Sequence, residues 1–147
     1  MSENIKMKGS MVGVLKKANG EVQTVRKDNI ILNAGFDFIC DAIGEASARP
    51  NAMGYIAIGS GATAAAANQT ALTAEITRKA ASYTHTAGTK VMAFSTTFGA
   101  GIGTGAVCEA GVVNASSGGT FLDRLTFAVI NKGVDDELTM TFQFTLS

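Results

Sequence analysis

The sequence predicts an all-β fold: an antiparallel β-sandwich of jelly-roll type, with about eight strands and one short helix near residues 34–43. The clearest observation is the stretch 136–146, where large apolar and polar residues alternate without a break. A period of two places one set on a buried face of a strand and the other on a wet face. In addition, short apolar runs follow one another with turn residues between them, and only one stretch has clear helical spacing. Strands without intervening helices argue against a parallel α/β sheet.

The N-terminal region predicts an arm followed by a hairpin. Residues 1–10 are polar and indicate a flexible arm, which leaves 11–147 as a single β-sandwich domain. Two β-prone runs, 11–17 and 21–26, flank Asn19-Gly20. Both turn positions of an Asn-Gly pair can adopt positive φ, so this pair is typical of a tight hairpin.

The predicted helix follows a further short apolar run at 29–32. Asn33 has the chemistry of an N-cap, and Gly44 suits a left-handed C-terminal position. Apolar residues at helical spacing form a stripe that we expect to cover the open end of the β core. These residues are Phe36, Ile39, Cys40 and Ile43.

The rest of the chain predicts strands separated by turns rich in glycine and serine. We expect a helical turn over 70–76, and turns at 87–89, 99–105, 116–119 and 131–133. The predicted strands are, in order, 54–58, 78–86, 90–98, 106–114, 121–130 and 136–146.

The composition narrows the classes of function. Twelve basic and twelve acidic residues give a formal net charge of zero, which argues against a dedicated nucleic-acid-binding protein. Charged residues make up only 16% of the chain, against roughly 25% in an average soluble domain. Residues 62–74 carry no charge at all. Because interface cores are depleted in charge, such a surface suits a protein that is covered by partners.

The cysteines and the hydropathy of the N-terminal region indicate the cellular compartment in which the protein assembles. Cys40 and Cys108 are far apart in sequence, and we expect two buried, reduced thiols, consistent with assembly in a cytoplasm. Residues 1–10 lack the apolar segment of a signal peptide. No apolar run approaches the roughly 18 residues of a membrane span, so we expect no membrane partner.

The sequence assigns no catalytic, cofactor-binding or metal-ligating residue. His85 has no orienting acid or nucleophile-elbow serine near it in the sequence, so we expect an exposed or interface histidine. The segments 59–63 and 99–103 lack the lysine of a phosphate-binding loop and predict tight turns. The acidic residues at 135–137 lack calcium-loop spacing and predict a solvated turn, and two cysteines with one histidine form no zinc signature. Asp37 and Asp41 mark the wet face of the helix.

A succession of short motifs resembles the small virion structural proteins of tailed bacteriophages, most of all the capsid cement (decoration) proteins. The motifs, in order, are Asn33-Ala34-Gly35, the segment 55–63, Leu72 with Glu75 and Arg78, Glu109-Ala110-Gly111, the segment 122–127, Lys132-Gly133 and the segment 136–139. The resemblance implies a jelly-roll or sandwich fold, self-association as a dimer or trimer, and no catalysis. It also implies binding to the major capsid protein on the outside of a shell assembled in the host cytoplasm.

Two other functions stay open at this point. A tail- or collar-associated virion component would use similar strand-and-turn sequences. A carbohydrate-binding sandwich is the third reading, with Tyr55 and Tyr83 as its only tyrosines. For a virion protein, Arg78, Lys79 and Lys90 would offer polar contacts. If the strand 136–146 lies at a sheet edge, its backbone would offer a site for strand addition by a neighbouring chain, and its outer face has no charge to oppose this.

Overall fold

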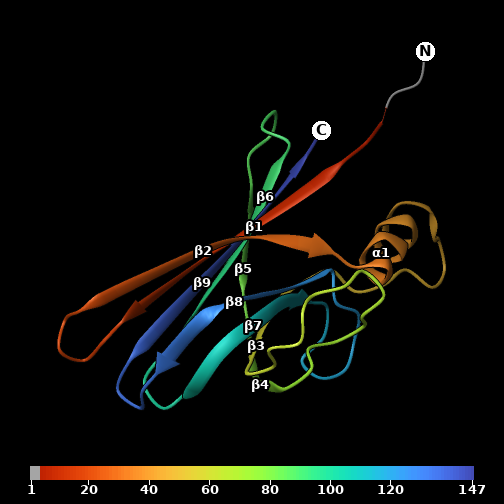
Figure 1. Cartoon of the computed structure of the whole chain (residues 1–147). Coiled ribbons are helices and arrows are strands. Elements are labelled where there is room, and N and C mark those ends of the chain that lie inside the picture. Colours follow the sequence, from red (N-terminus) through yellow and green to blue (C-terminus); the bar gives the residue numbers. More distant parts are fainter. Residues whose placement is uncertain (1–3) are drawn as a thin grey trace.

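The structure, a computed structural model, describes residues 4–147 and contains nine strands, all antiparallel, and one helix (Figure 1). The elements are β1 (Met7–Lys16), β2 (Val22–Ile31), α1 (Asn33–Gly44), β3 (Tyr55–Gly59), β4 (Glu75–Ala80), β5 (Ser82–His85), β6 (Val91–Phe98), β7 (Gly105–Val113), β8 (Asp123–Lys132) and β9 (Glu137–Leu146). The strands form one sheet in the order β4-β3-β7-β8-β2-β1-β9-β6-β5. The all-β antiparallel class and the single short helix are therefore confirmed.

The sheet curls into a nearly closed, barrel-like or sandwich-like arrangement because its two end strands are consecutive in sequence. Only Ala81 separates β4 from β5, and its amide donates to the carbonyl of Gly54 (2.9 Å) instead of to a strand. Side chains also cross between β4 and β6: Lys79 Nζ donates to the Thr97 carbonyl at 2.6 Å. The single strand expected over 78–86 is thus two strands, which raises the count from about eight to nine.

Strand β9 has the alternation that the sequence predicts. Four of its large side chains are completely buried: Leu138, Met140, Phe142 and Phe144. However, β9 pairs with β1 on one side and with β6 on the other. It has no free edge, so the prediction that a neighbouring chain could add a strand to it is wrong.

Apolar side chains gather on both faces of the β3–β7 half of the sheet. The main core lies inside the curl and includes Met11, Leu15, Phe98 and Phe127. A smaller cluster lies on the other face, where the long segment 60–74 covers β3 and β7; it consists of Leu32, Ala57, Leu72, Val113 and Phe121. Both faces of β7 are therefore buried, although only one face of β9 is.

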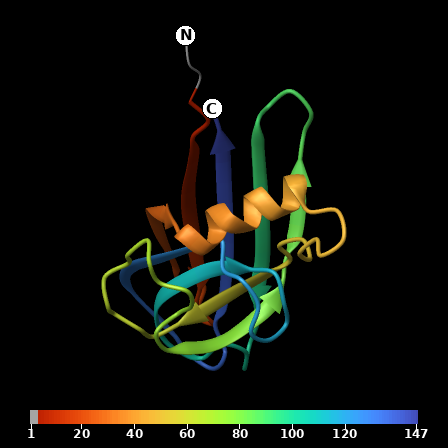
Figure 2. The ribbon, with the colours of Figure 1, turned by 90° about the vertical axis from the view of Figure 1, so that its right-hand side faces the viewer.

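Helix α1 lies across β1, β9 and β6 (Figure 2), but with a different face inward from the one expected. Gly35 is buried against the backbone of Leu122, and a Cβ at this position would overlap the Leu122 carbonyl oxygen. This close approach turns Phe38, Ile39 and Ala42 inward, at positions i+3, i+4 and i+7 from Gly35. The stripe prediction is wrong for Phe36, Cys40 and Ile43, which are exposed.

Three other local predictions also differ from the structure. Asn33 is the first helical residue instead of the N-cap; Gly44 is the last helical residue and lacks the positive φ expected of it, because the helix ends with an extended residue, Glu45. Residues 70–76 form bends leading into β4 instead of a helical turn, because the amides of Thr73 and Ala74 bind a side-chain carboxylate. Of the predicted arm, Met7–Ser10 belong to β1, and residues 1–3 lie outside the described part of the chain.

Candidate functional site

An apolar pocket with a volume of about 580 Å³ lies between α1 and the inner faces of β5 and β6. Its lining includes three methionines, Met7, Met53 and Met92, which are flexible and adapt to differently shaped apolar groups. The other lining residues are Phe38, Ile39, Ala42, Arg49, Pro50, Ala52, Tyr83, Phe94 and Leu122. A half-open cavity of this size and composition can bind an apolar group from another molecule.

Arg49 is the only charged residue that lines this pocket. It is exposed, and among residues 4–147 its guanidinium forms no hydrogen bond or ion pair. Tyr83, which is 57% exposed, lies on another side of the pocket with its ring centroid 5.4 Å from that of Phe94. The pocket therefore combines apolar walls with one cationic group.

The pocket adjoins an end of the sheet. Strand β5 carries Tyr83, pairs only with β6, and has all four residues exposed. An edge strand presents backbone groups that can pair with an extended segment of another chain. The pocket can therefore bind a side chain of another chain beside the place where β5 can pair with the backbone of that chain.

A second surface, the β1–β9–β6 outer face, has no charge over its centre. It consists of Ser10, Val12, Val14, Ser95, Thr97, Thr139, Thr141 and Gln143, which share one face by the pairing register. The hydroxyls pair with one another: Thr97 Oγ1 lies 2.8 Å from Thr139 Oγ1, and Ser95 Oγ lies 3.1 Å from Thr141 Oγ1. Because each of these hydroxyls already has a partner, covering this face with another protein leaves fewer groups unsatisfied.

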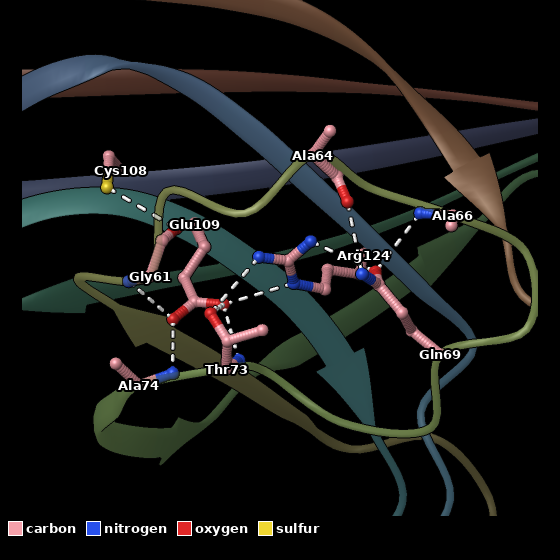
Figure 3. A network of polar contacts seen from close by, with 9 residues as sticks. All are labelled: Gly61, Ala64, Ala66, Gln69, Thr73, Ala74, Cys108, Glu109 and Arg124. Atoms are coloured by element: carbon pink, nitrogen blue, oxygen red, sulfur yellow. Dashed lines mark hydrogen bonds and ion pairs between the residues drawn. The ribbon is translucent and has the colours of Figure 1, made fainter.

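Figure 3 shows a buried polar network that fixes the segment 60–74 to β7 and β8. The carboxylate of Glu109, in β7, accepts hydrogen bonds from the amides of Gly61 (2.7 Å), Thr73 (2.8 Å) and Ala74 (2.7 Å). Within the segment 59–63, the Gly61 amide thus binds the chain's own carboxylate. The tight turn predicted there is wrong, because Gly59 ends β3 and the Ser60 amide donates to the Ala74 carbonyl (2.9 Å) instead of closing a turn.

Arg124, in β8, completes this network. Its Nε lies 3.1 Å from Glu109 Oε1, and neither side chain has any exposed surface. Its terminal nitrogens donate to Gln69 Oε1 (3.0 Å) and Thr73 Oγ1 (3.4 Å). A buried pair needs such additional partners, because desolvation of the two charges otherwise exceeds their attraction.

Asp123, next to Arg124 in sequence, is also buried but has no cationic partner among the described residues. Its carboxyl accepts from the Val112 amide (2.8 Å) and from Asn29 Nδ2 (2.7 Å). Burial raises the pKa of Asp123 to about 8, and the backbone hydrogen bonds oppose that rise only in part. Asp123 is therefore mainly protonated at neutral pH.

Most residues that the sequence singled out lie apart from the pocket. His85 is exposed, as expected, with Nδ1 2.6 Å from the Val91 carbonyl. Asp136 accepts from the amides of Gly133 and Ala18 in an exposed turn, and these hydrogen bonds lower its pKa. Asp37 and Asp41 are exposed on α1, as predicted.

The thiols and the basic residues are placed differently from the predictions. Cys108 is buried and free, but Cys40 is exposed, so the expectation of two buried thiols is wrong for Cys40. Arg78 is held in the fold by Glu75 (Nη2 to Oε1, 2.7 Å) and by the carbonyls of Ala115 and Gly118. Its guanidinium also lies 5.3 Å from the centre of the Phe121 ring. Arg78 is thus a poor candidate for a partner contact.

Sequence reasoning did not identify Glu109, Arg124 or Arg49 as parts of a site. Glu109 and Arg124 stand in two of the motifs that carry the resemblance, but nothing in those motifs indicates that the two side chains meet; the one signal is a charged residue inside a strongly β-prone run, since such residues are rarely buried without a partner. Arg49 lies in the loop 45–53, where nothing in the sequence distinguishes it from a solvated residue.

Comparison with known proteins gives no relative: no protein-family model, no curated protein and no solved structure matches this chain. Within residues 4–147 there is no cluster of three or more histidine, cysteine or acidic side chains that could hold a metal ion. In the same part of the chain, no helix has the length and apolarity needed to cross a membrane.

Proposed function

We propose that this chain is a non-enzymatic structural protein of a phage virion, which binds the outside of the capsid and stabilises the shell by bridging major capsid protein subunits. The β1–β9–β6 outer face is the observation that carries the proposal. Its eight residues are uncharged, and within β1, β9 and β6 charged side chains share this face only toward the strand ends, at Lys8, Lys16 and Glu137. The neighbouring strand β2 borders the face with two exposed charges, Arg26 beside Val12 and Asp28 beside Ser10. A surface of this kind suits long-term coverage by another protein.

The curled sheet supports the same role. Because β4 and β5 are joined through Ala81, the two ends of the sheet are held together by the chain itself. Backbone pairing on both sides of β9 and β1 keeps the outer face in a fixed shape. A rigid face lets many symmetry-related copies bind a shell together, and repeated weak contacts then add up to strong retention.

The motif resemblance adds a further argument. Several of its motifs, namely Gly61 within 55–63, Glu109 and Arg124, meet in the buried network of Figure 3. They share a structural purpose, which is to fix the segment 60–74 over the sheet. These motifs therefore support a rigid structural protein more than a catalytic one.

The test is addition of the purified protein to mature capsids that lack it. We expect saturable binding, with hundreds of copies over the shell, and higher resistance of the shell to heat or denaturant. A tail or collar component would instead be present in few copies, at the neck or tail. Failure to bind shells, together with absence from purified heads, would reject the proposal.

A further inference from the structure

The apolar pocket beneath α1 is large enough for a small-molecule ligand. Its volume is about 580 Å³, whereas an apolar cavity of about 150 Å³ is enough to hold benzene. A single side chain of a partner would therefore fill only part of the pocket. Filling it takes a molecule with several apolar groups in a row, and the volume lies within the range of small-molecule sites, roughly 300–1,000 Å³.

The walls of the pocket favour a flexible, unbranched ligand. Met7, Met53 and Met92 reach it from three separate parts of the chain, namely β1, the segment before β3, and β6. Methionine side chains are unbranched and adjust to the shape of an apolar neighbour. Phe38 and Phe94 add flat apolar surface between them. An alkyl chain can follow walls of this kind in more than one conformation, which a rigid ring system cannot do.

Arg49 adds one unpaired positive charge to these walls. The acidic residue nearest to it in sequence, Glu45, is occupied: its carboxylate accepts from the amides of Ser47 and Ala48, both at 3.2 Å. No other acidic side chain of residues 4–147 forms an ion pair with Arg49 either, so its guanidinium has no internal counter-ion. A guanidinium offers parallel N–H donors that match the two oxygens of a carboxylate.

We propose that this pocket binds a single-chain aliphatic carboxylate, with the chemistry of a medium-chain fatty acid. The alkyl chain lies among the methionines, and the carboxylate accepts hydrogen bonds from Arg49. A doubly charged phosphate monoester would need a second cation, which the described residues that line the pocket do not supply. The inference goes beyond the proposed function, because such a ligand binds the free protein whether or not a shell is present.

The first test is calorimetric titration of the full chain with octanoate and decanoate, each below the concentration at which it forms micelles. We expect saturable binding of one molecule per chain. The affinity should rise about fourfold for each added methylene, because each one buries further apolar surface. Decanoate that does not saturate at millimolar concentrations, or equal affinity for the two chain lengths, overturns the proposal.

The second test separates the charge from the apolar walls. Arg49→Gln should raise the dissociation constant for decanoate about five- to tenfold, since it removes one partly exposed charged contact. The same variant should bind uncharged 1-decanol like the wild type. The matched control is Arg26→Gln, at an exposed arginine of β2 that does not line the pocket. Unchanged decanoate binding by Arg49→Gln contradicts the assignment of the carboxylate to this residue.

The third test locates the ligand through the methyl resonances of the methionines. Decanoate should shift the signals of Met53 and Met92, which line the pocket. The signals of Met11 and Met140, which are buried in the core away from it, should stay in place. Equal shifts of all four signals would mean that decanoate does not select the pocket. Cosedimentation with phosphatidylglycerol vesicles, without saturable binding of free decanoate, would identify a membrane surface as the occupant and contradict the proposal.

Discussion

Glu109 Oε1 lies 3.1 Å from Arg124 Nε, and both side chains are completely buried between β7, β8 and the segment 60–74. The pair alone is weak evidence of stability, because desolvation offsets the attraction of the two charges. The carboxylate also binds three backbone amides of the segment 60–74, which has no regular structure. Glu109 therefore determines the path of this segment over the sheet.

Glu109→Gln should therefore be strongly destabilising. The substitution keeps the shape but leaves Arg124 without its counter-charge and turns an amide NH₂ toward backbone donors. We expect a loss of about 3–5 kcal/mol in the free energy of unfolding, measured by urea denaturation. Glu75→Gln is the matched control, since its pair with Arg78 is partly exposed and should contribute about 1 kcal/mol or less. Equal effects of the two substitutions would contradict the structural role of Glu109.

Asp123 should make the protein less stable as the pH rises from about 4 to about 8. The pKa of Asp123 is about 8 in the folded state, against 3.8 for an aspartate in the open, so in this range the unfolded chain loses the proton that the folded chain keeps. Asp123→Asn should remove this contribution, which is on the order of a few kcal/mol across the range. The measurement is the difference in unfolding free energy between variant and wild type as a function of pH. A difference that does not change with pH would show that Asp123 is not a buried, titrating acid.

Gly35→Ala should displace α1, because the added Cβ would overlap the Leu122 carbonyl oxygen. We expect a loss of about 1–3 kcal/mol in unfolding free energy, and a change in the near-ultraviolet signal of Tyr83 in the adjoining pocket. Gly44→Ala is the control: a Cβ there meets nothing within 4 Å. It should be neutral or stabilise the helix by up to about 1 kcal/mol. If Gly35→Ala behaves like Gly44→Ala, the close approach of the helix is wrong.

The two thiols should react at very different rates. Cys40 is exposed on α1, whereas burial protects Cys108 and raises its pKa, and its Sγ lies 3.4 Å from the Gly61 carbonyl. A thiol reagent should therefore label one cysteine rapidly and the second only on unfolding. Cys40→Ser should abolish the rapid phase. Rapid labelling that persists in this variant would mean that Cys108 is accessible.

Local patterns in the sequence predict the individual strands well. The alternation of 136–146 identifies β9, and the Asn19-Gly20 pair places the turn between β1 and β2, because each signal depends only on near neighbours. The division of 78–86 at Ala81 was missed, since it depends on pairing with β3 and β6 at opposite ends of the sheet.

The candidate site was much harder to predict. The face that α1 turns inward depends on contact between Gly35 and Leu122, which are far apart in sequence. The stripe of Phe36, Cys40 and Ile43 was an equally apolar choice, so helical periodicity could not distinguish the two faces. The pocket beneath α1 and the partners of Glu109 follow from such long-range contacts, which no local pattern encodes.

Shell binding by variants of the β1–β9–β6 outer face tests the account most directly. Thr141→Glu places a charge at the centre of this face, and Asn131→Glu places one at an exposed position of β8 outside it. Both variants should fold, as checked by thermal unfolding. We predict that Thr141→Glu abolishes saturable binding to mature capsids while Asn131→Glu binds like wild type; wild-type binding by both variants would contradict the assignment of this face to the shell.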